Sequence, residues 1–191
     1  MPDLKLDRAK TAVLCMDVHN LTLGRVPENQ RERLLATIRR VLDAARQAGV
    51  LVVYVAIGRR ADFSSPRNKF TGRAASPASP VEQAERLKIP DRVAPLDNDP
   101  IVRKPRMNAF YGSELQTMLA ARDVDTLVLT GIATNFVVES TARYAADADY
   151  RVIVLEDGCA AASEEEHERA IASMEPLVHI ARADDFLASV R

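Results

Sequence analysis

Two side chains that could do chemistry stand where predicted strands end. Asp17 follows the apolar run at 11–16, and Lys104 ends a short apolar stretch at 101–104. A carboxylate at such a buried strand end is costly unless it is paired or used. Together the two groups could carry out acid–base chemistry on a small ligand. Each also has an ordinary explanation, because an Asp can cap a turn after a strand and a Lys can extend to solvent.

A turn of small residues follows another apolar run, at 126–130. Gly131 is expected to end that strand, and Thr134 is expected to cap a helix that continues to about 147. The positive end of this helix would point at whatever binds over the carboxyl edge of the sheet. The turn is therefore the third candidate part of a ligand site.

These segments resemble the isochorismatase-like, or cysteine hydrolase, superfamily, which includes nicotinamidases and N-carbamoylsarcosine amidases. The resemblance rests on Asp17, on the segment 104–115 and on the string Gly131-Ile-Ala-Thr-Asn-Phe-Val-Val-Glu-Ser-Thr-Ala-Arg143. It implies that Asp17 and Lys104 are catalytic and that a cis peptide joins Ile132 to Ala133. The substrate-binding candidates are Asn20, Arg67, Phe110, Ile132, Ala133, Thr134 and Val137.

One position departs from the family pattern, because Val137 stands where the amidases carry their nucleophilic cysteine. Cys15 and Cys159 are poor substitutes, since a thiol in apolar surroundings is inert. Isochorismatases proper also lack this cysteine and hydrolyse a vinyl ether, which needs an acid and no nucleophilic side chain. The resemblance therefore predicts a hydrolase that acts on a small ether, amide or related metabolite without a cysteine nucleophile. The alternative is a catalytically inactive protein of the same fold that binds a small molecule.

No metal or cofactor is predicted. His19 could contribute to a metal site, but His167 and His179 belong to distant elements, so no set of three ligands is visible. No Gly-x-Gly-x-x-Gly follows a strand, which disfavours a dinucleotide enzyme. Glu139 could face the site or solvent, and we favour solvent.

The elements that must position these residues alternate between strand and helix. Strands are expected at 11–17, 50–56, 101–104, 126–130, 150–157 and 177–180, and helices at 27–49, 113–123, 134–147, 163–174 and 183–190. This pattern predicts an α/β three-layer sandwich around a mainly parallel six-stranded sheet. The proline-rich stretch at about 57–99 is expected to be a long loop. Its segment Ser65-Pro-Arg-Asn-Lys69 resembles a loop that covers substrate in some relatives, although a solvated loop is as good an explanation.

Length and composition fit one domain spanning 1–191. The chain is 47% hydrophobic and 28% charged with a formal net charge of −1, so nothing favours a nucleic-acid or membrane partner. Two cysteines without metal-site spacing, and no leader or membrane-length apolar run, indicate a cytoplasmic protein. We expect a homo-oligomer, a dimer or tetramer, because relatives commonly form them and Phe110 and Tyr111 offer apolar surface.

Overall fold

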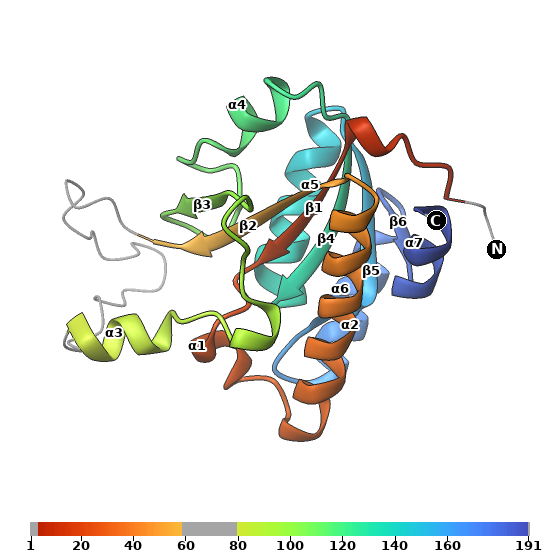
Figure 1. Ribbon diagram of the computed structural model, residues 1–191. Helices are drawn as coiled ribbons and strands as arrows, with labels where there is room; N and C mark the ends of the chain where they lie inside the picture. The colour runs from red at the N-terminus through yellow and green to blue at the C-terminus, as the bar shows by residue number, and fades with distance from the viewer. Residues whose placement is uncertain (1–3, 59–79, 191) are drawn as a thin grey trace.

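A parallel sheet forms the centre of the protein. The computed structural model describes residues 4–58 and 80–190, and its six strands are ordered β3-β2-β1-β4-β5-β6 (Figure 1). All five neighbouring pairs are parallel. The strands are β1 (Thr11–Met16), β2 (Leu51–Ile57), β3 (Ile101–Lys104), β4 (Thr126–Ile132), β5 (Arg151–Ala160) and β6 (His179–Ala181). The predicted α/β fold with six strands is confirmed.

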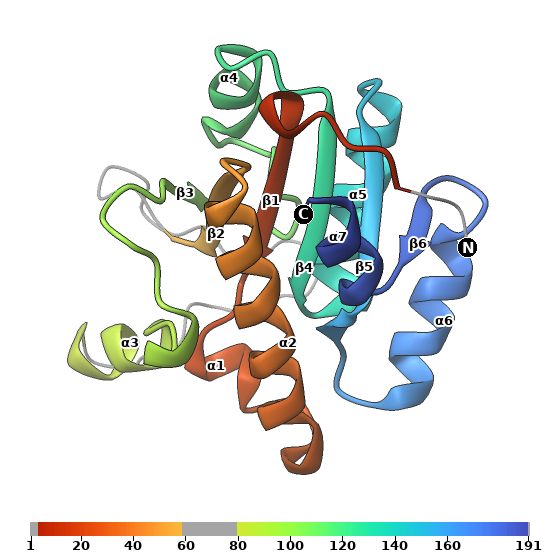
Figure 2. The same cartoon turned by 45° about the vertical axis from the view of Figure 1, so that its right-hand side comes forward.

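Helices cover both faces of the sheet. One face packs against α2 (Glu28–Gln47) and α7 (Ala183–Ser189); the other packs against α4 (Leu115–Ala120), α5 (Glu139–Asp147) and α6 (Glu164–Met174) (Figures 1 and 2). Side chains alternate along a strand, so each strand contributes to two apolar clusters. In β1, Val13 and Cys15 belong to the first cluster, and Leu14 and Met16 belong to the second.

The strand order creates a crevice at the carboxyl edge. From β1 the chain moves outward to β2 and β3 and then returns to place β4 on the other side of β1. The connections that leave β1 and β4 therefore diverge at their carboxyl ends, which is where ligands bind in open α/β sheets. Asp17 directly follows β1, and Ala133 directly follows β4.

The described part of the stretch at 57–99 is more structured than the sequence predicted. It contains α3 (Pro80–Arg86) and the short 3₁₀ helix η2 (Asp91–Val93), while Ile57 belongs to β2. Val93 is buried in the apolar cluster under α2, and the Tyr54 hydroxyl donates to its carbonyl at 2.7 Å. This burial explains why 91–93 is ordered, so the prediction of one long loop is wrong for 80–99. Arg67 and the rest of the proposed covering segment lie outside the described residues.

The connections that follow β1 and β4 also differ from the predictions. β4 continues through Gly131 to Ile132, and a short helix, α1 (Asn20–Leu23), follows β1. The segment η3 (Thr134–Val138) is one turn of π-helix that leads into α5. Such turns are rare and occur frequently at functional sites.

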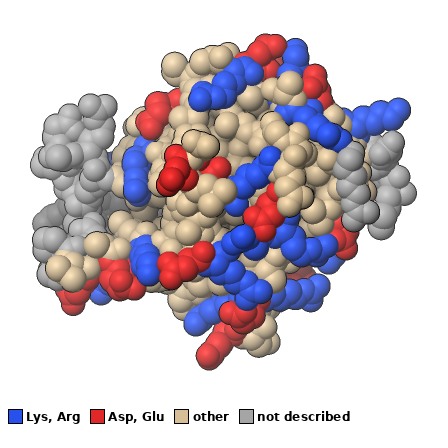
Figure 3. All heavy atoms as spheres, viewed as in Figure 1, with Lys and Arg blue, Asp and Glu red and all other residues tan. Residues whose placement is uncertain are grey.

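The surface carries interspersed charges of both signs (Figure 3). On α2, Arg39 pairs with Asp43 and Arg40 with Asp184, each at 2.5 Å. These two arginines contact carboxylates, so α2 does not present a uniform basic face. In the described part of the chain, no helix is long and apolar enough to cross a membrane.

Candidate active site

Asp17 and Lys104 form a buried ion pair. The Lys104 Nζ donates to Asp17 Oδ2 at 2.7 Å, although β2 separates the two strands that carry these residues. The exposed fraction of the side chain is 1% for Lys104 and 11% for Asp17. The structure thus brings together the two residues predicted from strand ends, and their catalytic role stays a prediction.

The end of β2 holds this pair in place. Ile57, its last residue, donates its backbone N–H to Asp17 Oδ1 at 2.9 Å and lies in register with Lys104. Asp17 has a positive φ of 51°, a conformation that Asp tolerates better than most residues. Lys104 Nζ also donates to the carbonyl oxygen of Arg106 at 2.9 Å. Both Asp17 oxygens are therefore acceptors, and two of the three Lys104 ammonium hydrogens are used.

Gly131 brings the turn after β4 against the end of β1. It lies in register with Met16, and its φ is 147°. A Cβ at this position would lie 2.2 Å from the Met16 carbonyl oxygen, so only glycine fits without movement of the backbone. The peptide bond between Ile132 and Ala133 is cis, as predicted. The turn thus begins beside the residue that precedes Asp17.

Thr134 is fully buried, and its hydroxyl lies 2.8 Å from Nδ1 of His167 on α6. The prediction that it caps the following helix is wrong, because the helix begins after Ala133 without a side-chain cap. Burial lowers the pKa of His167, with nearby carboxylates opposing that effect. Val137 lies in the same π-helical turn, 2% exposed within the second apolar cluster.

Two other candidates have partners elsewhere. Asn20 donates its side-chain amide to the carbonyl oxygen and carboxylate of Glu85, which ties α1 to α3. Phe110 is 6% exposed and stacks on Tyr144, with ring centroids 4.9 Å apart. It therefore belongs to the core and offers little apolar surface, whereas substrate contact by Asn20 and by Phe110 stays a prediction.

Glu139 accepts hydrogen bonds from Arg143 and from Ser173 on α6. It connects two helices and, at its position on α5, is only partly exposed to solvent. The preference for a solvent-facing side chain is therefore correct only in part. Its carboxylate is used for packing α5 against α6.

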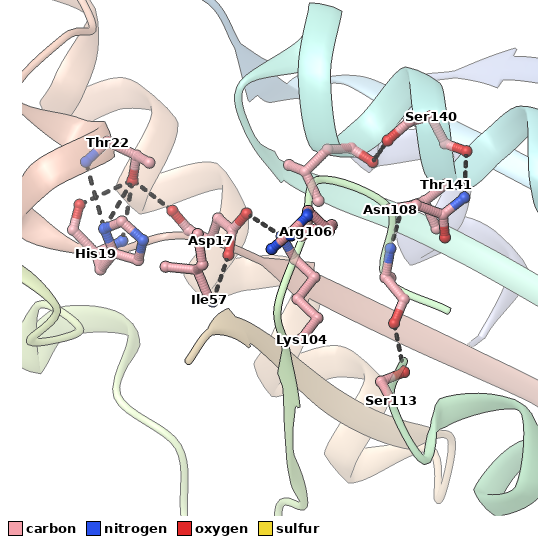
Figure 4. A network of polar contacts seen from close by, with 12 residues as sticks. Asp17, His19, Thr22, Ile57, Lys104, Arg106, Asn108, Ser113, Ser140 and Thr141 are labelled. Carbon is pink, nitrogen blue, oxygen red and sulfur yellow. Dashed lines mark hydrogen bonds and ion pairs between the residues drawn. The ribbon is translucent and has the colours of Figure 1, made fainter. Parts of the chain in front are cut away.

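His19 is the residue that the sequence-based site assignment missed. It is 1% exposed and is the N-cap of α1. Its ring nitrogen Nδ1 accepts a hydrogen bond from the Thr22 backbone N–H, 3.3 Å away (Figure 4). Burial lowers its pKa, while Asp17 raises it and Lys104 lowers it. Its position two residues after Asp17 was the available signal, but only a metal role was considered for it.

The two cysteines are free and buried. Burial raises the pKa of Cys15 and of Cys159 to about 12, which disfavours the reactive thiolate in both. Within residues 4–58 and 80–190, no group of three or more His, Cys, Asp or Glu side chains is arranged to hold a metal ion. The ionisable side chains that the structure brings near one another here are Asp17, Lys104 and His19.

Comparisons with known proteins bear on the family and the fold of the chain. A family model, the isochorismatase domain, matches residues 11–185. The chain is 32% identical over 194 residues to the isochorismatase family protein YwoC of Bacillus subtilis (strain 168), covering all of both chains. It is 31% identical over 176 residues to the ureidoacrylate amidohydrolase RutB of Stutzerimonas stutzeri (strain A1501), covering 81% of this chain and 71% of RutB.

The fold is also shared with a solved amidase. The N-carbamoylsarcosine amidase of Thermoplasma acidophilum superposes with a TM-score of 0.74 at 27% identity, covering 92% of this chain and 97% of that one. The family match, the full-length similarity to YwoC and this common fold point to one conclusion. The chain belongs to the isochorismatase family.

Proposed function

We propose that this protein is a hydrolase that acts on a small metabolite without a cysteine nucleophile, with Asp17 as the general base and Lys104 as its partner. The observation that carries the proposal is the hydrogen bonding of Asp17. Both of its oxygens accept hydrogen bonds, from the Lys104 ammonium and from the Ile57 N–H. A carboxylate held in this way is arranged to accept a proton.

This arrangement favours attack by water on an amide or ureido carbonyl over protonation of a vinyl ether. Asp17 would take a proton from water as the water oxygen bonds to the carbonyl carbon. The carbon–nitrogen bond would then break, and Asp17 would return the proton to the leaving nitrogen. Asp17 and Arg106 use two hydrogens of the Lys104 ammonium, so the third could bind the oxygen that gains negative charge.

Val137 supports the direct use of water. Its side chain cannot attack a carbonyl, and burial disfavours the thiolates of Cys15 and Cys159. The names of RutB and of the Thermoplasma enzyme make amides with a ureido group the first substrates to test. The alternative, a protein that binds a small molecule without turnover, would keep the fold and lose the chemistry.

The test is hydrolysis of N-carbamoylsarcosine and ureidoacrylate, measured as the release of ammonia. Isochorismate is tested beside them as the vinyl ether substrate. We expect turnover of a ureido substrate that survives iodoacetamide and falls about 10²–10⁴-fold in Asp17→Asn. The matched control is Asp123→Asn, because Asp123 also has a positive φ, of 52°, and pairs with a lysine at the surface. Binding of a ureido compound with no turnover would contradict the hydrolase and favour the binding protein.

We also propose that the protein works in the cytoplasm as a homo-oligomer, a dimer or tetramer, with a small-molecule substrate and no nucleic-acid or membrane partner. Free thiols support a reducing compartment. Exposed Tyr111, Phe136 and Leu177 offer apolar surface, each at least 48% exposed. Light scattering that gives the mass of a single chain at micromolar concentration would contradict the oligomer.

A further inference from the structure

His19 carries a buried ring nitrogen without a partner. The residue is 1% exposed, yet its Nε2 has no hydrogen-bond partner, which is true of only three buried side-chain nitrogen or oxygen atoms in the described part of the chain. Buried polar groups nearly always have a partner, so such a nitrogen needs an explanation. Cap formation explains only the other ring nitrogen, Nδ1.

The cap determines which nitrogen carries the proton. The backbone N–H of Thr22 points at Nδ1, 3.3 Å away, so Nδ1 must present its lone pair. The Thr22 hydroxyl donates to the Asp17 carbonyl oxygen, which fixes that side chain in the same arrangement. A neutral imidazole with an unprotonated Nδ1 carries its proton on Nε2. Burial lowers the pKa of His19 and so favours this neutral form.

The Nε2–H group is turned towards Asp17, the residue that pairs with Lys104. In Figure 4 the free ring nitrogen is on the side of the His19 ring that faces Asp17. Asp17 and Lys104 are the two side chains with the largest charge effects on the pKa of His19, which places the ring within their electrostatic reach. Asp17 itself is already engaged, since its two oxygens accept from Lys104 and Ile57. No described residue accepts a hydrogen bond from Nε2–H, so this group remains available to a bound molecule.

We propose that His19 is a substrate-binding residue, whose Nε2–H donates a hydrogen bond to an unprotonated oxygen of the substrate. Together with the remaining Lys104 hydrogen, it selects small molecules that present a carbonyl or carboxylate oxygen and rejects those that present only donors, such as amines. The inference rests on the proposed function in one respect: it takes the Asp17–Lys104 site to be where substrate binds. It does not require turnover.

Two substitutions separate the cap from the donor. His19→Asn keeps an acceptor at the position of Nδ1 and is a preferred helix cap, but it removes the group at Nε2. His19→Gln keeps an amide N–H that reaches the position of Nε2, but it loses the Nδ1 acceptor. A purely structural role predicts that the Gln variant is the more damaged one in every measurement. A substrate-binding role predicts opposite orders for thermal stability and for ligand affinity.

The experiment measures Kd by calorimetry for N-carbamoylsarcosine, ureidoacrylate and methylamine, with melting temperatures for each variant. We expect one ureido acid to bind and methylamine not to bind. His19→Asn should weaken binding about tenfold, the value of one hydrogen bond, while it melts near the wild type. His19→Gln should bind more tightly than the Asn variant although it melts lower. Nitrogen NMR of the ring at pH 7.5 should show the proton on Nε2.

Three results would overturn the proposal: equal affinity in the wild type and His19→Asn, a ring proton on Nδ1, or binding of neither ureido acid by the wild type. Failure of the proposed hydrolase looks different. In that case a ureido acid binds and the variants differ as expected, but no ammonia is released. The role of His19 in binding would then hold for a protein without turnover.

Discussion

Removal of one partner from the Asp17–Lys104 pair should destabilise the protein, and removal of both should not. In Asp17→Asn, the Asn side chain can still accept the Ile57 N–H, but its NH₂ group would face the Lys104 ammonium. Lys104 would keep only the Arg106 carbonyl oxygen as an acceptor. Its side chain is 1% exposed, so water cannot replace the lost carboxylate. The charge would then be buried without compensation.

The expected cost is about 3–5 kcal/mol in the free energy of unfolding, the usual result of breaking a buried pair. For a chain of this size, 1 kcal/mol shifts the melting temperature by about 2–4 °C, so the fall should be about 6–20 °C. Lys104→Met in the same chain removes the ammonium and fills similar space. The double variant should therefore recover most of the loss, because neither charge is then left buried without its partner.

The assay is chemical denaturation of the wild type, both single variants and the double variant, which together form a double-mutant cycle. Asp123→Asn provides the matched control. Asp123 also has a positive φ, of 52°, and pairs with Lys10 at 3.1 Å, but its side chain is 86% exposed. Its replacement should leave the unfolding free energy nearly unchanged, since exposed pairs contribute little. Additive losses in the double variant would refute the reasoning, because they would mean that the two charges do not stabilise each other.

Three further predictions concern the turn and the histidines. Gly131→Ala should lower the free energy of unfolding by about 1–3 kcal/mol or more, because its Cβ would lie 2.2 Å from a backbone oxygen. Gly49→Ala is the control, since Gly49 also has a positive φ but open space around it, and it should lower the free energy of unfolding less. Val137→Cys places a thiol near the start of a helix, where the helix dipole favours the thiolate. Mass spectrometry should therefore show faster alkylation of this thiol than of Cys15 and Cys159. An unreactive new thiol would contradict the idea that the turn faces the site. Burial lowers the pKa of His19 and of His167, so the unfolded chain binds more protons than the folded protein at acidic pH. The melting temperature should therefore fall as the pH drops below about 6.5. A melting temperature that does not change with pH in this range would contradict the prediction.

The sequence was most informative where chemistry and topology coincide. Asp17 and Lys104 stand at the ends of strands whose side chains are apolar on both faces. The carboxyl ends of parallel strands meet at one edge of the sheet. That rule alone predicts that the two side chains approach each other, and they do so at 2.7 Å. The sequence also shows a glycine at 131, but it does not show why glycine is required there. The reason is the close approach of the Met16 backbone, which follows from the register between β1 and β4.

The errors arose where a local pattern was used to infer a tertiary contact. Thr134 has the right type and position for a helix cap, but its hydroxyl contacts His167, a residue 33 positions away. Phe110 is expected to offer apolar surface, yet it is 6% exposed and stacks on Tyr144. Residues 80–99 lack a sustained apolar period, and their order depends on Val93 packing beneath a helix that the local sequence does not reveal. Propensity was outweighed by packing in each case.

His19 shows why a site cannot be completed from residue types alone. A histidine two positions after a strand-end carboxylate could be a ligand, a base, a cap or a core residue, and its spacing favours none of these. The distinction comes from the two ring nitrogens separately. One is satisfied by Thr22 and thereby fixes the proton on the other, which is buried beside Asp17 and has no acceptor. The helix that follows β1 thus turns a common residue into a directed hydrogen-bond donor, because capping and burial act on the same ring.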